Sequence, residues 1–419
     1  MISKYFVPGF VLCWLAVTQV ADPAVAQSPI QPGDRIAIVG NTFADQLRIH
    51  GYLETLLLQH TIDNPVSIRN LGWGGDMLTA RDRPTGFPSE SSTLTAHSTD
   101  VIIACFGMGE SFAGETGVAD FKRRVEAFIK MHAGQKYNGN SDVRLILVSP
   151  IACEDLGELT PEHQARNRDL RSYAQAMQEV AAASNLPMVD LFEASRYLME
   201  EPAGPKLTRN GIHLKAYGYW AISHSFFGQP TSSERAISPR PWTLSLDFSA
   251  ATAEAEGVEI TALREDADGL SFQVTERSFP SLPPPTSQSL PPQLEFRRDT
   301  LTVANLPPGS YELTVDGQPV ARADAKTWAI GVAIDASPAH REWESYRAAV
   351  NDKNLQFTYS WKALNQVHIV GERKQSPSGK ELPKEVIEFD RLAHQREEAL
   401  RKGVQRKSRQ WRISRIGNE

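Results

Sequence analysis

The segment DRIAIVGNT, residues 34–42, decides the fold. It is an aliphatic and β-branched run that stops at a glycine, followed by an asparagine and a threonine. Such a run predicts a buried strand, and the Gly-Asn-Thr after it predicts a tight turn into a helix. Up to residue 229 the same alternation recurs. The predicted strands are Arg35–Val39, Ser67–Leu71, Val101–Phe106, Val143–Ser149 and Pro187–Asp190, and the predicted helices include Phe43–Gln59, Gly117–Met131, Pro161–Ser184 and Ala216–Phe226. This pattern predicts a three-layer α/β domain with a parallel sheet.

Three further short, glycine-containing segments lie beside predicted strands or helices: NLGWGGD at residues 70–76, GMGE at residues 107–110, and NGIH at residues 210–213. The first two come directly after predicted strands, as Gly40-Asn41-Thr42 does, and the third precedes the last predicted helix. Ligands of parallel sheets sit at the carboxyl ends of the strands. We therefore expect these segments to converge on one site.

The order and spacing of the four segments resemble the four blocks of the SGNH, or GDSL-type, ester hydrolases. The resemblance covers residues 34–229 and implies a flavodoxin-like parallel sheet and ester hydrolysis. In that family a serine nucleophile, an oxyanion-hole glycine, an oxyanion-hole asparagine and an Asp-x-x-His pair occupy the blocks. The matching positions here are Thr42, Gly75, Gly109, and Asn210 with His213.

Thr42 has two interpretations. As the resemblance implies, its hydroxyl is a nucleophile, although the γ-methyl group restricts χ1 and crowds the approach of a substrate. Alternatively, Thr42-x-x-Asp45 is a helix-capping pattern, in which the hydroxyl only satisfies a free backbone amide. The sequence leaves both open.

The third block lacks a side-chain donor. Loss of one oxyanion-hole donor costs other acyl-transfer enzymes about 2.7–4 kcal/mol of transition-state stabilisation. The backbone N–H of Gly109 or the hydroxyl of Ser111 would have to replace it, beside the backbone N–H of Gly75. The alternative for both glycines is an ordinary turn after a strand.

His213 is the expected general base. The i, i+3 spacing lets Asn210 accept a hydrogen bond from its imidazole and fix the tautomer, although an amide offers no negative charge to the imidazolium. Asp76 and Glu110 are alternative acids.

The chain changes character after residue 229. Residues 240–335 predict a β-rich, sandwich-like domain interrupted by a proline-rich exposed loop at Ser278–Pro292. Its predicted strands are Trp242–Phe248, Gly257–Leu263, Gly269–Val274, Leu294–Phe296, Thr300–Ala304, Gly309–Val315 and Val320–Ala323. Residues 336–419 predict a helical, charged extension with helices at His340–Lys353 and Asp390–Lys402. The basic cluster Arg401–Arg415 is interpreted as a solvated tail.

Composition narrows the possible partners and locations. A length of 419 residues suggests two domains with appendages, and a net charge of −6 argues against nucleic-acid binding. Residues 1–26, an apolar run ending in Ala24-Val25-Ala26, predict a signal peptide and export to the periplasm or outside the cell. We expect no later membrane span, and no metal or cofactor motif occurs. Cys105 and Cys153 are expected to be buried thiols.

These observations predict an exported esterase that hydrolyses small or carbohydrate (acetyl) esters, with Thr42 as nucleophile and His213 as base. The carbohydrate class comes from the resemblance and from export. The alternatives are a catalytically impaired pseudoenzyme that binds a glycan or peptide, and a scaffold for assembly. The oligomeric state is left open.

Overall fold

The computed structural model describes residues 29–84, 87–201, 204–227, 241–266, 268–290, 294, 298–363 and 375–417. The predicted signal peptide lies outside these residues, as does most of the predicted strand Leu294–Phe296.

The first part of the chain forms a five-stranded sheet in the order β2-β1-β3-β4-β5, in which every pairing is parallel. This is the flavodoxin-like strand order. The strands are β1 (Arg35–Gly40), β2 (Ser67–Asn70), β3 (Val101–Cys105), β4 (Arg144–Val148) and β5 (Met188–Val189). The predicted α/β class and the five predicted strands are confirmed.

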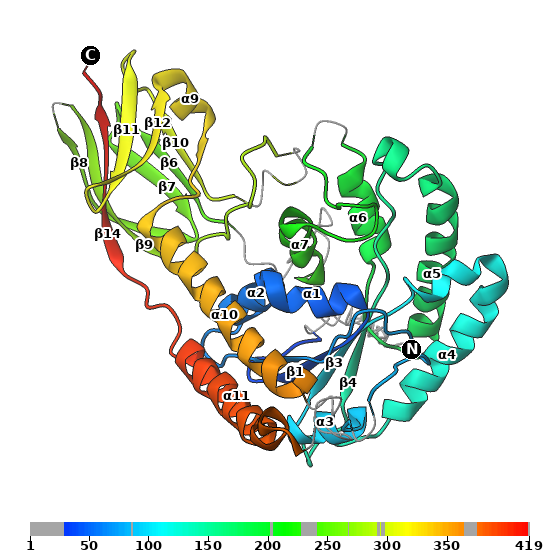
Figure 1. The fold of residues 1–419 in the computed structure, drawn as a ribbon. Helices are drawn as coiled ribbons and strands as arrows, with labels where there is room; N and C mark the ends of the chain where they lie inside the picture. Colours follow the sequence, from blue (N-terminus) through cyan, green and yellow to red (C-terminus); the bar gives the residue numbers. More distant parts are fainter. Residues whose placement is uncertain are drawn as a thin grey trace, which may run out of the picture.

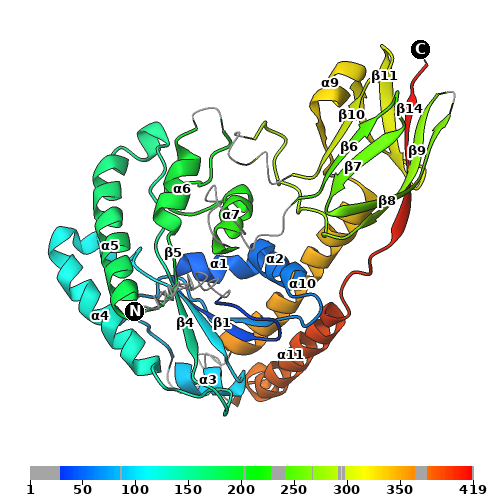
Figure 2. The ribbon, with the colours of Figure 1, turned by 180° about the vertical axis from the view of Figure 1, so that it is seen from behind.

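Helices cover both faces of this sheet, because alternate residues of each strand point to opposite sides. Ile36 and Ile38 of β1 join one apolar core, and Ala37 and Val39 join the other. In Figures 1 and 2 one layer lies on each side of the sheet. The first layer holds α1 (Thr42–His50), α2 (Tyr52–His60), α6 (Leu191–Met199) and α7 (Ala216–Ser223). The second layer holds α4 (Val118–His132) and α5 (His163–Ala183). The short helix α3 (Glu90–Ala96) contributes Leu94 to the core of this second layer.

The predicted helix Phe43–Gln59 is in fact two helices. Gly51 separates α1 from α2 with a φ of 68°, a left-handed conformation that ends α1. The apolar pattern continues through the break, which is why periodicity predicted one helix.

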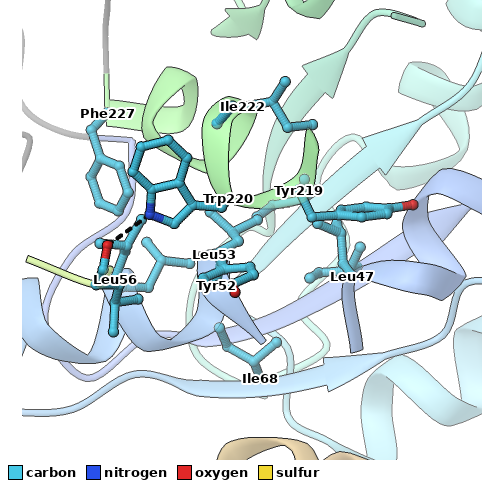
Figure 3. Packing of buried hydrophobic residues seen from close by; sticks show 14 of the residues in the cluster. Leu47, Tyr52, Leu53, Leu56, Ile68, Tyr219, Trp220, Ile222 and Phe227 are labelled. Carbon is cyan, nitrogen blue, oxygen red and sulfur yellow. Dashed lines mark hydrogen bonds between the residues drawn. The ribbon is translucent and has the colours of Figure 1, made fainter. Parts of the chain in front are cut away.

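The last helix of this domain buries its aromatic side chains. Figure 3 shows Trp220 of α7 packed among Leu53, Leu56 and Phe227. The indole N–H of Trp220 donates to the Leu282 carbonyl over 2.7 Å. Leu282 is buried in the same core, so the proline-rich segment is irregular, as predicted, but it is not simply an exposed loop.

The β-rich part consists of a four-stranded and a five-stranded sheet that share one apolar core. The first has the order β13-β10-β6-β7 and the second β12-β11-β14-β9-β8. Their bounds are β6 (Thr243–Asp247), β7 (Thr252–Glu256), β8 (Val258–Asp266), β9 (Gly269–Glu276), β10 (Thr300–Ala304), β11 (Ser310–Val315), β12 (Gln318–Asp324), β13 (Val332–Ala333) and β14 (Ser408–Arg415), with a short helix α9 (Ala325–Ile330) before β13. A sandwich-like domain was predicted. One pair departs from an antiparallel sandwich, because β6 and β10 are parallel.

The interpretation of Arg401–Arg415 as a solvated tail is wrong. Its second half is β14, the middle strand of the five-stranded sheet, paired antiparallel with β9 and β11. Trp411 and Ile413 point into the core with no exposed surface. Their alternation with the polar residues Gln410, Arg412 and Ser414 is a strand signal that the charge of the segment obscured.

The two long helices of the C-terminal part are α10 (Pro338–Ala363) and α11 (Pro377–Arg401). The first contains the predicted helix His340–Lys353, and the second covers the predicted Asp390–Lys402 except for its last residue, the C-cap Lys402. They lie along the β2 side of the parallel sheet (Figure 1). Trp343 and Val350 join one core of the α/β domain, and Phe357 and Trp361 join the other. These helices are therefore part of the α/β body. None of the helices in the described ranges is long and apolar enough to cross a membrane.

Candidate active site

Thr42 is the first residue of α1, at the carboxyl end of β1. The cap of this helix is Asn41, whose side-chain oxygen accepts a hydrogen bond from Phe43 N over 3.0 Å. The capping interpretation of Thr42 is therefore wrong, because its neighbour performs that role. The Thr42 hydroxyl instead accepts a hydrogen bond from Gly75 N over 3.3 Å.

Gly75 belongs to a loop that follows β2 and reaches over the end of β1. Trp73 N donates to Gly40 O over 2.9 Å, and Asp76 N donates to Trp73 O over 3.1 Å. Gly75 has a φ of 87°, and a β-carbon there would meet nothing within 4 Å. The backbone conformation, not a lack of space, therefore favours glycine at this position.

Gly109 lies at the start of a short 3-10 helix, η1 (Glu110–Ala113), after β3. A β-carbon at position 109 would lie 2.8 Å from Met77 Cγ and 3.0 Å from its Sδ. Met77 thus fills the space that a larger side chain would need. Where the family has an asparagine side chain, this chain has the thioether of Met77 packed against Gly109.

The other candidates in this block are already engaged. Ser111 is fully buried, and its hydroxyl donates to Met108 O and accepts from Arg166, so it is not a spare oxyanion donor. Glu110 accepts hydrogen bonds from Leu78 N and Gly107 N at 2.8 and 2.9 Å. It holds the loop in place, and its carboxylate is not the acid beside His213 that the sequence left open.

His213 and Asn210 lie together as the spacing predicted. Asn210 Oδ1 is 3.0 Å from His213 Nδ1 and accepts from His213 N over 3.0 Å. The other candidate acid, Asp76, is paired with Arg83 at 2.8 and 2.6 Å. Burial, followed by the nearby Arg209 charge, lowers the pKa of His213. The imidazole is therefore neutral near pH 7, the form a general base needs.

Glu154 is a residue that sequence reasoning missed. It is 1% exposed and accepts hydrogen bonds from Leu207 N at 3.0 Å and from Thr208 N at 2.7 Å, while its own N–H donates to Gly211 O over 2.9 Å. It fixes the loop that carries His213. A buried carboxylate that binds backbone amides far along the chain leaves no local sequence signal.

One cavity of about 180 Å³ joins four of the five predicted site residues: Thr42, Gly75, Gly109 and His213. Asn210 stands behind His213. The rest of the lining is largely apolar, with Phe43, Phe106, Met108, Phe112, Pro150, Ile151, Ile212 and Tyr219. Within the described ranges no hydrogen bond joins the Thr42 hydroxyl to His213. Such contacts commonly tighten only when substrate binds.

The cavity offers no evident metal site: among the residues that the structure describes, no three His, Cys, Asp or Glu side chains gather to hold an ion. Cys105 lies at the cavity wall as a buried free thiol, and burial raises its pKa, so it is not a reactive thiolate. Cys153 is also buried and free, as predicted.

Residues 33–221 match the model of the GDSL-like lipase/acylhydrolase family. This part of the chain is a GDSL-like domain. The match agrees with the resemblance noted in the four segments, and it supports ester hydrolysis as the activity class. None of the curated proteins compared with this sequence matches it.

One solved structure shares the fold over most of the chain. A gut microbial diltiazem-metabolizing enzyme aligns with 93% of this chain and 99% of its own, at 16% identity and a TM-score of 0.67. The alignment therefore extends beyond the GDSL-like domain. An acetylxylan esterase from Geobacillus stearothermophilus covers 48% of this chain and 94% of its own, at 14% identity and a TM-score of 0.37. An α/β hydrolase from the metagenome of Lake Arreo, Spain, covers 48% and 96%, at 17% identity and a TM-score of 0.35.

Proposed function

We propose that this protein is an exported esterase in which Thr42 is the nucleophile and His213 the general base. The observation that carries the proposal is the single cavity lined by Thr42, Gly75, Gly109 and His213, in which Gly75 N donates to the Thr42 hydroxyl. Export rests on the predicted signal peptide, residues 1–26.

In this mechanism Thr42 Oγ1 attacks the ester carbonyl carbon, and its proton passes to His213. The carbonyl oxygen becomes an oxyanion bonded to that same carbon, within reach of the Gly75 N–H. Collapse expels the alcohol, which takes the proton from His213. Water then attacks the acyl-threonine by the same route, with His213 again as base. Asn210 orients the imidazole throughout.

The backbone N–H of Gly109 is the proposed second oxyanion donor. Gly109 lines the cavity, and Met77 occupies the space beside it where the family has a side chain. A backbone amide at the start of a short helix is a donor of the kind used in oxyanion holes.

The substrate is proposed to be a small or carbohydrate ester, acetyl esters included. The largely apolar wall suits an acyl group, and it offers no unpaired charge, because Asp76 is neutralised by Arg83. Phe112 stands at the cavity with 68% of its surface exposed, where its ring can stack on the alcohol part of a substrate.

The test compares wild type with Thr42→Ala, Thr42→Ser and His213→Ala on aryl acetates and acetylated oligosaccharides. Both alanine variants should lose at least about 10³-fold in kcat while remaining folded, by analogy with nucleophile and base removal in other acyl-transfer enzymes. Thr42→Ser should keep or raise activity, because it removes only the crowding methyl group. Thr314→Ala, the same chemical change in the β-rich part, is the matched control and should behave as wild type.

A second candidate is a pseudoenzyme that binds a glycan or peptide without turnover. Met77 in the space at Gly109 favours it, since an oxyanion donor has been replaced by apolar packing. Absence of turnover in both wild type and Thr42→Ser, with ligand binding that His213→Ala weakens, would establish this role instead.

A further inference from the structure

The helix α10 connects the β-rich part to the active-site end of the GDSL-like domain. It has 26 residues, Pro338–Ala363, and at 1.5 Å per residue it is roughly 39 Å long. Figures 1 and 2 show it running from the sandwich to the sheet. The two ends of this helix make different contacts.

At the sandwich end, a buried set of side chains anchors the helix. His340 Nε2 lies 2.9 Å from Asp299 Oδ2, and Ser337 Oγ lies 2.7 Å from His340 Nδ1. Asp299 also accepts from Trp242 N over 2.9 Å. The three side chains Ser337, His340 and Asp299 are at most 1% exposed. Although this is a Ser-His-Asp set, no substrate reaches it, and its role here is to fix the helix to the sandwich.

At the other end, the last turn of α10 reaches the loops that carry the proposed site. Lys362 Nζ lies 2.6 Å from Asp45 Oδ1 and 4.9 Å from the centre of the Trp73 ring. Trp361 packs edge to face against Trp73 and Phe87, with ring centres 5.5 Å apart in both pairs. Lys362 therefore touches two segments that are separate in sequence.

Those two segments are the ones that set the nucleophile and the oxyanion donor. Asp45 lies one turn after Thr42 in α1, and its N–H donates to Asn41 O over 3.0 Å. Trp73 begins the loop that holds Gly75. The hydrogen bond between Gly75 N and Thr42 Oγ1 spans the gap between them. A contact that fixes Asp45 relative to Trp73 thus fixes the spacing across this gap.

We propose that Trp361 and Lys362 are positioning residues for the active site, which hold the Thr42 helix and the Trp73–Asp76 loop at a working distance. Neither residue lines the cavity, so they act through Asp45 and Trp73 and not on substrate. The β-rich part contributes by anchoring the far end of α10. The effect on turnover rests on the proposed esterase function; the effect on the loop does not.

The experiment uses Lys362→Met, which keeps the side-chain stem but removes the charge, and Lys362→Arg, which restores it. The control is Asp352→Asn, also in α10, which breaks the partly exposed ion pair between Asp352 and Arg396 of α11. Turnover of an aryl acetate, the thermal midpoint and amide hydrogen exchange over residues 72–77 are measured for each variant and for wild type.

Lys362→Met should lower kcat about tenfold, with KM changed less than twofold, because a displacement of the reacting groups acts on the transition state. It should also speed amide exchange over residues 72–77 relative to Asp352→Asn, while the two variants have the same thermal midpoint. Lys362→Arg should recover both. Unchanged exchange over residues 72–77, or a change matched by Asp352→Asn, would overturn the proposal.

The two proposals fail in distinguishable ways. If wild type and Thr42→Ser show no turnover, the esterase function fails, and hydrogen exchange alone decides whether Lys362 holds the loop. If wild type turns over and Lys362→Met loosens the loop without lowering kcat, the positioning role is wrong while the esterase function stands.

Discussion

Different kinds of contact stabilise the GDSL-like domain at the carboxyl ends of its strands and along the side of the sheet formed by β2. At the carboxyl ends of the strands, hydrogen bonds between partly or fully exposed groups join the site residues, such as Gly75 N to Thr42 Oγ1 at 3.3 Å, and Asn210 Oδ1 to the Nδ1 and backbone N of His213, both at 3.0 Å. Along the β2 side, buried ion pairs attach the C-terminal helices. The difference indicates that losses at the first edge fall on activity, and losses at the second fall on stability.

The β2 side carries two such pairs. Lys353 Nζ of α10 lies 2.5 Å from Glu54 Oε1 and also donates to Ile68 O of β2 over 2.9 Å. Arg69 of β2 binds both carboxylate oxygens of Glu397 in α11, at 3.1 and 2.9 Å. The edge strand β2 is thereby covered, which removes an open edge from the domain.

The largest effect should come from breaking the ion pair between Lys353 and Glu54, which is the more buried of the two pairs. Lys353→Met leaves Glu54 buried without its cation, and loss of one partner of such a pair costs about 3–5 kcal/mol. Lys353 is 1% exposed, so water cannot compensate. Urea unfolding should show this loss, while kcat per folded molecule should stay near that of wild type.

The double variant Glu54→Gln with Lys353→Met is the matched control. It removes both charges and keeps a side-chain acceptor for the Asn354 amide, which now donates to Glu54 over 2.8 Å. It should regain most of the stability lost in the single variant. A single variant as stable as wild type would contradict the proposed contrast between the two edges.

The second effect is a pH dependence of the protein's stability, which comes from Glu397. Burial would raise the pKa of its carboxyl, but Arg69, Lys353 and Ser67 together lower it from 4.5 to about 2. A depressed folded pKa stabilises the protein above the unfolded value, and this contribution is lost as pH falls from about 4.5 towards 2. The full loss is about 3 kcal/mol.

Urea unfolding at a series of pH values from 6 to 3 measures this loss. Glu397→Gln should be less stable at pH 6 and should lose less stability on acidification than wild type. Glu398→Gln, one residue on and 74% exposed, is the control and should follow the wild-type curve. Parallel curves for wild type and Glu397→Gln would show that this carboxylate does not carry the dependence.

The same contrast explains what the sequence could predict. The five strands were predictable because aliphatic runs are local, and the pairing of Asn210 with His213 was predictable from an i, i+3 spacing. The role of Asn41 as the cap was missed because Thr42-x-x-Asp45 is an equally good local pattern. Asp45 is instead held by Arg48 and by Lys362, which lies 317 residues away.

The remaining errors share this long-range cause. Arg401–Arg415 carries so much charge that it was interpreted as a tail, yet β14 is stabilised by strands more than 90 residues earlier, β9 and β11. Met77 fills the space at Gly109 from a different loop. Such contacts depend on the fold and leave little trace in a single segment.

The smallest effect belongs to the site edge. Burial and the Arg209 charge lower the pKa of His213, so the neutral base should persist below pH 6.5 and the acid limb of kcat/KM should lie below that value. Arg209→Gln removes the lesser of the two causes and should move this limb upward, with kcat on the plateau nearly unchanged. Arg415→Gln, on β14, is the charge-matched control. An acid limb that stays in place in Arg209→Gln would show that burial alone sets the pKa of His213, whereas loss of the plateau would show that Arg209 does more at the site than bias a proton.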